Sequence, residues 1–380
     1  MTLLNVLCVF GTRPDAIKMA PVVLELKRRS QQFNVRVAVT GQHREMLDQV
    51  LSVFQIKPDF DLNIMSHGAT LTEITNRALQ GLEPILRDNA FDWVLAQGDT
   101  TTTFAAGLAA FYQKIAFGHV EAGLRTGNKY DPFPEEMNRL LVSRLAELHF
   151  APTQDAVDNL LNEGIPRAGI YRTGNTGIDA LLEVAKRPYT ADNAELSDVL
   201  NDPRRMILVT THRRENWGAP MARIATAIKL IVQMHPDVVA VVPMHRNPLV
   251  RESLIPILGN HPSIKLIEPP DYVPFVKLQQ KATLILTDSG GVQEEAPSLG
   301  KPVLVLRETT ERPEGIAAGA ARLVGTDIER IVDEANVLLE EGAEYEAMAR
   351  TQSPYGDGSA SAQIAEALVE AATPRETTHQ

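Results

Sequence analysis

The chain has 380 residues, which is too long for one ordinary core, so about two domains of roughly 100–200 residues are expected. Acidic residues outnumber basic ones by 48 to 37, and the formal charge of −11 argues against nucleic acid or an anionic membrane as the main partner. The single cysteine, Cys8, excludes an internal disulfide and a cysteine-rich metal site. No signal-peptide pattern opens the chain and no apolar stretch reaches about 18 residues, so we expect a cytoplasmic protein without a membrane span.

In the first half, short apolar runs alternate with longer amphipathic stretches. This alternation is typical of parallel strands joined by helices, and near-continuous apolar strands fit a sheet that is covered on both faces. Strands are predicted at residues 6–10, 35–40, 93–96, 115–120 and 149–151. Helices are predicted at residues 17–29, 44–54, 102–112, 135–147 and 155–162.

A helical stretch at about 179–204 interrupts the alternation, which then resumes. Strands are predicted at residues 206–210, 238–243, 264–267, 284–287, 303–306 and 322–324. Helices are predicted at residues 219–234, 274–281, 292–299 and 328–341, with a last helix at about 356–372 and a frayed tail after it. The sequence therefore predicts an α/β protein with two Rossmann-like, doubly wound domains, residues 1–175 and residues 176–355.

Polar residues follow several predicted strands of the first domain, where an open parallel sheet binds its ligands. Arg13 and Lys18 lie five residues apart around a predicted helix start and can both face an anion there, or can simply be two solvated bases. Asp99 and Glu121 end two apolar runs, and Glu135 opens a helix. A carboxylate at a helix start often only complements the dipole, but three acids that converge with one histidine suit proton transfer at carbon.

In the second domain, the stretch LILTDSGGVQEEAPSLGKPVLVL (284–306) passes from a strand through Asp-Ser-Gly-Gly into a helix. Its bare backbone at 289–291 permits close approach, and the free N–H groups of the helix start favour a phosphate. Glu294 or Glu295, one turn further on, would repel a phosphate but can accept hydrogen bonds from sugar hydroxyls. A nucleotide with its diphosphate on the glycines fits this pattern, and a tight strand–helix turn is the alternative.

Several familiar motifs are missing. No G-x-G-x-x-G follows the first predicted strand, and neither G-x-x-x-x-G-K-[ST] nor H-E-x-x-H occurs. These absences argue against NAD-type hydride transfer and P-loop hydrolysis, and no metal is expected.

In their order along the chain, the motifs resemble those of the non-hydrolysing UDP-N-acetylglucosamine 2-epimerases. The matching segments are GTRPDAIKMAP (11–21), GQHREMLDQVL (41–51), QGDTTTTFA (97–105), HVEAGLRTGN (119–128), PFPEEMNR (132–139), GNTGIDAL (174–181), THRRENWG (211–218), the long stretch 287–315 and SPYGDGSAS (353–361). The resemblance implies a GT-B-like fold, in which two Rossmann-like domains face each other across a cleft and the C-terminal helix packs back on the first domain. It also implies a homodimer and interconversion of UDP-GlcNAc and UDP-ManNAc without a cofactor.

The resemblance further implies a mechanism and a set of site residues. A base removes the C2 proton while UDP leaves C1 by anti elimination, and UDP then adds back to a trapped 2-acetamidoglucal as a proton reaches C2 from the opposite face. The implied catalytic residues are Asp99, Glu121, Glu135 and His212. The implied substrate-binding residues are Arg13, Lys18, Asp99, Glu121, His212, Pro270, Phe275, Ser289, Gly290, Gly291, Glu295 and Arg312. Of these, Glu295 is implied for the ribose and Arg312 for the phosphates, whereas Pro270 and Phe275 fall in the uracil-binding segment.

Bacterial members of the family bind a second UDP-GlcNAc as an activator. The residues that match that pocket are Gln42, His43, Glu136, Arg213 and His245. Glu45 replaces a glutamine of the family pattern, and Gly68-Ala69 replaces an Arg-Gln pair. An acid in place of an amide and a lost arginine both disfavour a diphosphate-sugar, so we expect weakened or absent activation.

Several alternatives stay open at this stage. The chain could be a C2 epimerase of another UDP-2-acetamido sugar, such as a 2,3-diacetamido uronic acid, or a hydrolysing form that releases the free sugar. It could also be a GT-B glycosyltransferase that needs an acceptor, or a non-catalytic module that binds UDP-sugars.

Overall fold

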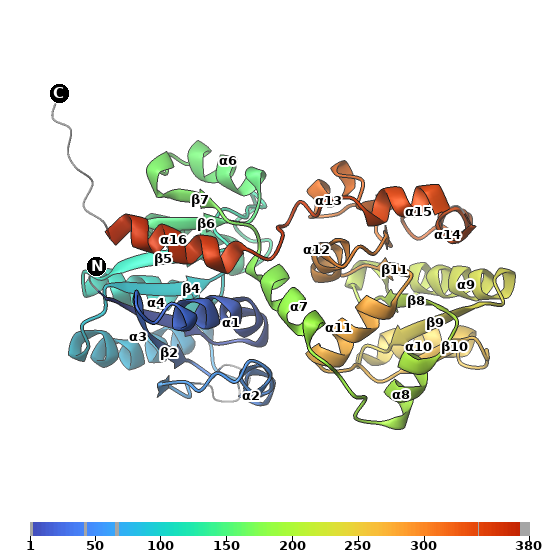
Figure 1. Cartoon of the computed structure of the whole chain (residues 1–380), viewed down its shortest axis with the longest axis horizontal. Coiled ribbons are helices and arrows are strands. Elements are labelled where there is room, and N and C mark those ends of the chain that lie inside the picture. The colour runs from blue at the N-terminus through green and yellow to red at the C-terminus, as the bar shows by residue number, and fades with distance from the viewer. Residues whose placement is uncertain (1–2, 42–43, 65–67, 341, 373–380) are drawn as a thin grey trace. The chain divides into compact units, whose positions relative to one another are not determined.

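The structure, a computed structural model, describes residues 3–41, 44–64, 68–340 and 342–372. It contains two compact units (Figure 1). The first takes the described residues up to Ala180 and those from Tyr355 on, and the second is Leu181–Pro354. The division falls inside a helix, α7 (Thr176–Lys186), a few residues after the expected boundary at 175/176.

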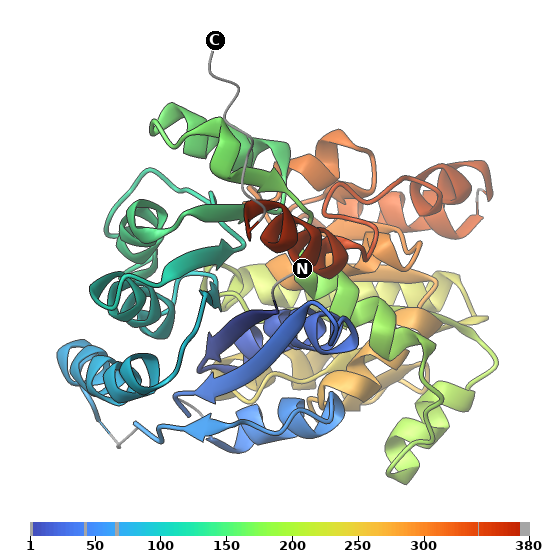
Figure 2. The same cartoon turned by 60° about the vertical axis from the view of Figure 1, so that its left-hand side comes forward.

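The first unit is built on a seven-stranded parallel sheet with the strand order β3-β2-β1-β4-β5-β6-β7. Its strands are β1 (Leu4–Phe10), β2 (Phe33–Val39), β3 (Phe60–Asp61), β4 (Trp93–Gln97), β5 (Ala116–Val120), β6 (Leu148–Ala151) and β7 (Ile170–Arg172). Its helices, with the first half of α7, are α1 (Arg13–Arg28), α2 (Arg44–Val53), α3 (Leu71–Asp88), α4 (Thr101–Tyr112), α5 (Glu135–Leu145), α6 (Gln154–Asn162), the short 3-10 helix η1 (Arg167–Gly169) and α16 (Ala360–Ala372). The α16 helix packs beside α1 (Figure 2).

Helix α3 was not among the predicted elements, although its sequence carries a clear start signal. Thr70 and Glu73 form a reciprocal capping box, in which each side chain accepts a hydrogen bond from the backbone of the other. The buried residues of α3 then recur at helical spacing: Ile74, Ala78, Leu82 and Leu86.

The last helix begins at Ala360 rather than near residue 356, because Gly356 and Gly358 have positive φ angles of 123° and 86°. The buried carboxylate of Asp179 accepts hydrogen bonds from the backbone N–H groups of Ala360 (3.3 Å) and Ser361 (2.7 Å). A carboxylate from α7 thus completes the start of α16.

The second unit has a six-stranded parallel sheet with the strand order β10-β9-β8-β11-β12-β13. Its strands are β8 (Arg205–Thr210), β9 (Val238–Pro243), β10 (Ile264–Ile267), β11 (Leu284–Thr287), β12 (Val303–Val305) and β13 (Ala321–Leu323). Its helices are α8 (Ala194–Asn201), the 3-10 helix η2 (Arg214–Asn216), α9 (Ala219–Met234), α10 (Pro248–Leu258), α11 (Tyr272–Lys281), α12 (Gly290–Ser298), α13 (Pro313–Ala317), α14 (Ile328–Glu340) and α15 (Gly342–Ala349).

Two predictions for this unit need correction. The single helical stretch expected at about 179–204 is two helices, α7 and α8, because the chain between them contains Pro188 and is not helical. Helix α10 was missed, although Asn247 caps its first turn and Pro248 stands at its first position. The predicted fold class is confirmed, since each unit is a parallel sheet whose strands alternate with helices.

Strand order decides where a site can form. In the first unit the chain leaves the central β1 to one side through β2 and to the other through β4, and in the second unit β8 has β9 and β11 as its neighbours. Ligands of open α/β sheets bind at such switch points, beyond the carboxyl ends of the strands. Arg13 and Asp99 follow β1 and β4, and His212 and Ser289 follow β8 and β11.

The interiors of both sheets are apolar, in agreement with strands that are covered on two faces. In the part of the chain that the structure describes, no helix has both the length and the hydropathy that a membrane span requires.

Candidate active site

The turn after β1 is held by a capping box at the start of α1. The backbone N–H of Thr12 donates to Asp15 (3.2 Å), and the N–H of Asp15 donates to Thr12 Oγ1 (3.4 Å). The Thr100 hydroxyl donates to the same Asp15 carboxylate over 3.3 Å, which links the ends of β1 and β4. Burial raises the pKa of Asp15 to about 6. Arg13 is the first residue of α1 and half-buried, so its position at the helix start is fixed by these bonds.

Glu121 follows β5 in the left-handed region, with a φ of 63°. One oxygen of its carboxylate is paired with Lys18 Nζ, and the other accepts a hydrogen bond from Gln97 Nε2. A non-glycine residue in this conformation is strained by about 1–3 kcal/mol and is usually held by its surroundings at a functional site. The structure therefore pairs Lys18 with Glu121, whereas the sequence suggested only that Lys18 could face a ligand anion beside Arg13.

His119 supports the neighbouring turn after β4. Its ring is buried, and burial lowers its pKa to about 3, so the imidazole is neutral at physiological pH. Its Nε2 lies 2.7 Å from the carbonyl oxygen of Gly98, and because a carbonyl only accepts, Nε2 is the donor. This bond fixes the backbone immediately before Asp99.

Asp99 is held from α5. Arg139 reaches its Oδ2 through Nε (2.9 Å) and Nη2 (2.7 Å), and Asn138 Nδ2 donates to its backbone carbonyl over 2.8 Å. A Cβ placed on Gly98 would lie 3.5 Å from Glu121 Oε2, so the two predicted carboxylates occupy adjacent strand ends. Two of the predicted catalytic acids thus follow adjacent strands, and each is held by a basic side chain.

Glu135 is the first residue of α5 and is half-buried. Its side chain makes no hydrogen bond or ion pair with another described residue, unlike Asp99 and Glu121. It lies on the same helix as Arg139, one turn away from the residue that holds Asp99.

In the second unit, His212 and Arg213 follow β8. The backbone N–H groups of both donate to the carboxylate of Asp288, at the end of β11. The ring of His212 stacks on that of His245, which follows β9, with the ring centroids 5.4 Å apart and the planes 16° apart. Burial lowers the pKa of His212, and the nearby Asp288 carboxylate opposes this effect.

The start of α12 is flanked by two guanidinium groups. A Cβ on Gly290 would lie 3.6 Å from Nη2 of Arg213 and 3.8 Å from Nη2 of Arg312. Ser289 stands at the N-cap position but makes no side-chain capping bond, and Gly291 is exposed with no atom near the place of a Cβ. Backbone N–H groups, a helix dipole and two arginines together make this loop suitable for a diphosphate.

The two glutamates of α12 have different partners. Glu294 is buried and paired with Arg312, whereas Glu295 is half-buried and accepts a hydrogen bond from Gln279 Nε2 over 2.7 Å. Glu295 is therefore the more exposed of the two and the better placed for ribose hydroxyls. Phe275 lies on α11 and packs against the core of the unit, and Pro270 lies in the loop before it.

The residues that match the activator pocket are only partly visible. Gln42 and His43 lie outside the described residues, as does the side chain of Glu45. Glu136 is buried, and both of its oxygens bind protein groups: Oε1 accepts from the N–H of Thr126 and Gly127 at 3.0 Å each, and Oε2 pairs with Arg139 at 3.1 Å.

Sequence reasoning missed several residues that hold the site together. Gln97, Asn138, Arg139, Gln279 and Asp288 each contact a predicted site residue. Arg139 stands three residues after Glu136, and that spacing on a helix was a usable signal for an ion pair. The other contacts join segments far apart in the chain and have no local signature.

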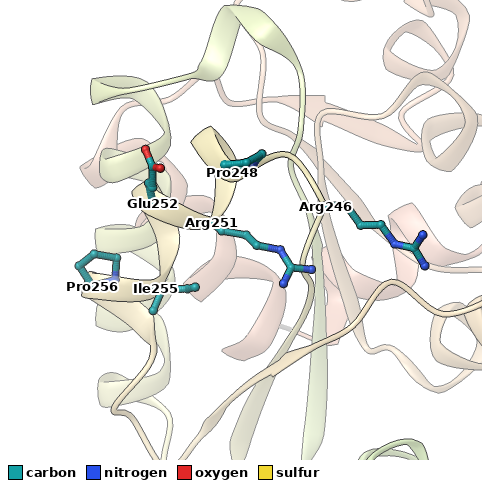
Figure 3. Close-up of a pocket in the computed structure, with 6 residues that line it drawn as sticks. All are labelled: Arg246, Pro248, Arg251, Glu252, Ile255 and Pro256. Carbon is teal, nitrogen blue, oxygen red and sulfur yellow. The ribbon is translucent and has the colours of Figure 1, made fainter.

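A pocket of about 570 Å³ lies along α10 (Figure 3). Its lining residues are Arg246, Pro248, Arg251, Glu252, Ile255 and Pro256. Arg251 is paired with Glu268, and Figure 3 shows Arg246 pointing away from the other labelled side chains. None of the predicted site residues lines this pocket. Among the described residues, no group of three or more His, Cys, Asp or Glu side chains is arranged to hold a metal ion.

Comparison with known proteins agrees with these features. The family profile described as UDP-N-acetylglucosamine 2-epimerase matches residues 25–369. A UDP-N-acetylglucosamine 2-epimerase of Salmonella typhimurium is 57% identical over 370 residues, which cover 96% of this chain and 98% of that protein.

Solved structures give the same result. A crystal structure of UDP-GlcNAc 2-epimerase from Neisseria meningitidis bound to UDP-GlcNAc is 50% identical, with a TM-score of 0.83 and coverage of 97% of this chain and 100% of that one. Another crystal structure of UDP-N-acetylglucosamine 2-epimerase is 51% identical, with a TM-score of 0.91 and coverage of 100% and 99%. The chain therefore belongs to the UDP-N-acetylglucosamine 2-epimerase family.

Proposed function

We propose that this protein interconverts UDP-GlcNAc and UDP-ManNAc by inverting C2 of the sugar. The observation that carries the proposal is the cluster at the first sheet's edge. There Asp99 and Glu121 stand on adjacent strand ends, restrained by Arg139 and Lys18, and Glu135 lies on the same helix as Arg139. Family membership and the UDP-GlcNAc bound to the Neisseria meningitidis relative support this substrate.

The proposed reaction is an elimination followed by an addition. A carboxylate takes the C2 proton, the C–H electrons form a C1–C2 double bond, and the C1–O bond breaks so that UDP leaves with its electron pair. UDP then adds back to C1 of the 2-acetamidoglucal while a proton reaches C2 from the other face. Neither the elimination nor the addition needs an oxidant or a reductant, so we propose that the reaction needs no cofactor.

Proton removal at C2 is difficult because no adjacent carbonyl delocalises the charge. The negative charge develops instead on the departing diphosphate, and groups that stabilise it lower the barrier most. We assign this role to Arg13, Lys18, His212, Arg312 and the N–H groups of Gly290 and Gly291, because the N–H of Ser289 already donates to Thr287 Oγ1 over 2.9 Å.

Proton NMR of UDP-GlcNAc with the protein in D2O tests the function. The expected result is formation of UDP-ManNAc with deuterium at C2 of both sugars. Free sugar would indicate the hydrolysing alternative, and the absence of any conversion without an acceptor would favour a glycosyltransferase or a binding module. Parallel assays with a UDP-2,3-diacetamido uronic acid distinguish the other epimerase.

The substitution Gly291→Ala is expected to weaken UDP binding without weakening the fold. Gly291 has an ordinary φ, and a Cβ placed on it would have no neighbouring described atom within 4 Å. The fold therefore tolerates a methyl group there. A glycine within a helix costs about 1 kcal/mol relative to alanine, so the substitution should leave the melting temperature unchanged or higher. The methyl would occupy the space that a phosphate needs, and calorimetry should show a loss in UDP affinity of about tenfold or more.

Gly342→Ala is the matched control for this substitution. Gly342 is the first residue of α15, and a Cβ placed on it would likewise have no neighbouring described atom within 4 Å. Along the chain it is far from every proposed site residue. It should leave UDP affinity unchanged. Equal UDP affinity of Gly291→Ala and Gly342→Ala would contradict the diphosphate assignment.

We also propose that activation by a second UDP-GlcNAc is weak or absent. Gly68, which stands where the family pattern has arginine, has a φ of 76°, a conformation that arginine rarely adopts. Initial rates should therefore depend hyperbolically on UDP-GlcNAc concentration. A sigmoidal dependence that Arg213→Ala abolishes would contradict this proposal.

From the family resemblance we also propose that the chain forms a homodimer. Sedimentation velocity at micromolar concentration measures this directly, and a single species with the mass of one chain would exclude it.

A further inference from the structure

Asp288 carries an ionisable side chain that the proposed mechanism does not use. It is fully buried, with 0% of its surface exposed, at the end of β11. A carboxylate without access to water is costly unless hydrogen bonds satisfy it. The donors that satisfy Asp288 therefore show what this buried charge organises.

All hydrogen-bond donors to the Asp288 carboxylate, among the described residues, belong to the loop at 211–216. The N–H groups of His212 (2.9 Å) and Arg213 (3.0 Å) reach Oδ2, together with the Thr211 hydroxyl (2.9 Å) and Asn216 Nδ2 (3.0 Å). One buried oxygen thus gathers four groups of one loop. The loop that presents His212 and Arg213 is shaped by a strand end 76 residues away in the chain.

The second oxygen of Asp288 faces the ring of His212. Oδ1 accepts a hydrogen bond from the His212 N–H over 3.1 Å and lies 3.4 Å from His212 Nδ1. The face of the ring is covered by His245, and Trp217 Nε1 donates to the His212 carbonyl over 3.1 Å. With one face stacked and Nδ1 turned to a carboxylate, the Nε2 edge is the part of the ring left for a ligand.

A fixed carboxylate beside Nδ1 determines which nitrogen holds the proton of the neutral imidazole. An anion next to Nδ1 favours a proton there, which leaves the lone pair on Nε2. The same charge stabilises the imidazolium when Nε2 takes a proton. Among the described residues, the other charged or titratable groups that act on this ring are His245 and Arg213, and both oppose the imidazolium.

We propose that Asp288 is a positioning residue for the epimerase reaction: it fixes the loop of His212 and Arg213 and keeps His212 Nδ1 protonated. Nε2 then faces the diphosphate, takes a proton when that anion is bound, and donates a hydrogen bond to the leaving group from an imidazolium that Asp288 stabilises. This inference rests on the proposed function, because it gives His212 a place beside UDP. Asp288 itself would touch no substrate atom.

The first test needs no variant. Nitrogen chemical shifts of the His212 ring in the unliganded protein above the titration midpoint report which nitrogen carries the proton. The expected result is a proton on Nδ1, and a proton on Nε2 would overturn the proposal.

The second test is Asp288→Asn, which keeps the size of the side chain and an oxygen that can still accept from the loop. Its amide would present N–H instead of a negative charge to His212 Nδ1. We expect kcat to fall roughly 100-fold, on the scale of losing an orienting partner, with KM changed far less. The NMR titration midpoint of His212 should fall by about one pH unit, because an attractive charge within about 4–6 Å has been removed.

Asp237→Asn is the control for the change of charge. Asp237 is an exposed residue of the same unit that stands just before β9, and its carboxylate pairs with Arg205. It should change neither kcat nor the His212 midpoint. If Asp288→Asn lowers kcat and kcat/KM no more than Asp237→Asn does, the proposal is wrong.

The variant His212→Gln separates failure of this inference from failure of the proposed function. If the function is right, His212→Gln slows turnover, and adding Asp288→Asn to it causes little further loss, since Asp288 acts through His212. Losses that multiply in the double variant would show that Asp288 acts independently of His212. An unchanged rate in His212→Gln alone would instead refute the role of His212 in the proposed function.

Discussion

Substitution of Asp99 by asparagine is expected to slow deuterium exchange at C2 severely while the protein remains folded and binds UDP. An amide cannot accept a proton from carbon, and general acid–base catalysis by one group contributes about 10²–10⁴-fold. The fold should persist because Arg139 reaches a single oxygen of Asp99, through Nε and Nη2, and an amide oxygen can accept the same bonds.

The measurement is proton NMR in D2O, with calorimetry of UDP binding in parallel. Exchange and epimerisation should fall together by about 10³-fold, within the range for one acid–base group, whereas UDP affinity should change little. Asp155→Asn, an exposed acid in the first turn of α6, is the control and should behave as the unsubstituted protein. Exchange at the normal rate in Asp99→Asn would remove Asp99 from the proton-transfer set.

The substitution Gly123→Ala is expected to be the most damaging single methyl group in the first unit. Gly123 has a φ of 91°, and a Cβ there would lie 2.2 Å from the carbonyl oxygen and 2.8 Å from the carbonyl carbon of Ala156. Both are backbone atoms of α6, which cannot move aside as a flexible side chain could. We expect a loss of stability of about 4 kcal/mol or more, which is the exceptional range for one substitution.

Gly127→Ala isolates the steric part of this effect. Gly127 also has a positive φ, of 77°, but a Cβ placed on it would have no neighbouring described atom within 4 Å. It should cost only the backbone term of about 1–2 kcal/mol. Thermal melting and soluble yield of the two variants provide the comparison, and similar losses in both would contradict the steric account.

A comparison of Gly123 with Gly291 also shows what kind of information a sequence carries. Gly123 and Gly291 both belong to motifs that identify the family, yet the sequence does not reveal why each is glycine. The structure separates them, because Gly123 is surrounded by backbone and Gly291 is open to solvent. The first is needed by the fold, and the second is available to a ligand.

Much of the architecture could be predicted from local patterns. Runs of apolar residues marked most strands, because a strand covered on both faces must be apolar throughout. Helices α3 and α10 were overlooked, although their starts carry ordinary capping signals at Thr70 and Asn247. The prediction of a single helical stretch at 179–204 was wrong, because helical periodicity does not show where a short break falls.

By itself, the sequence determined the α/β class, the order of most strands and helices along the chain, and which polar residues end the strands, since these depend on composition within a few residues. Tertiary structure alone decided which of these residues meet. Lys18 pairs with Glu121 across 103 residues, Arg139 with Asp99 across 40 and His212 with Asp288 across 76. Such contacts follow from strand order and backbone turns, because neighbours in a parallel sheet are set by packing of the whole unit and not by any periodicity in the chain.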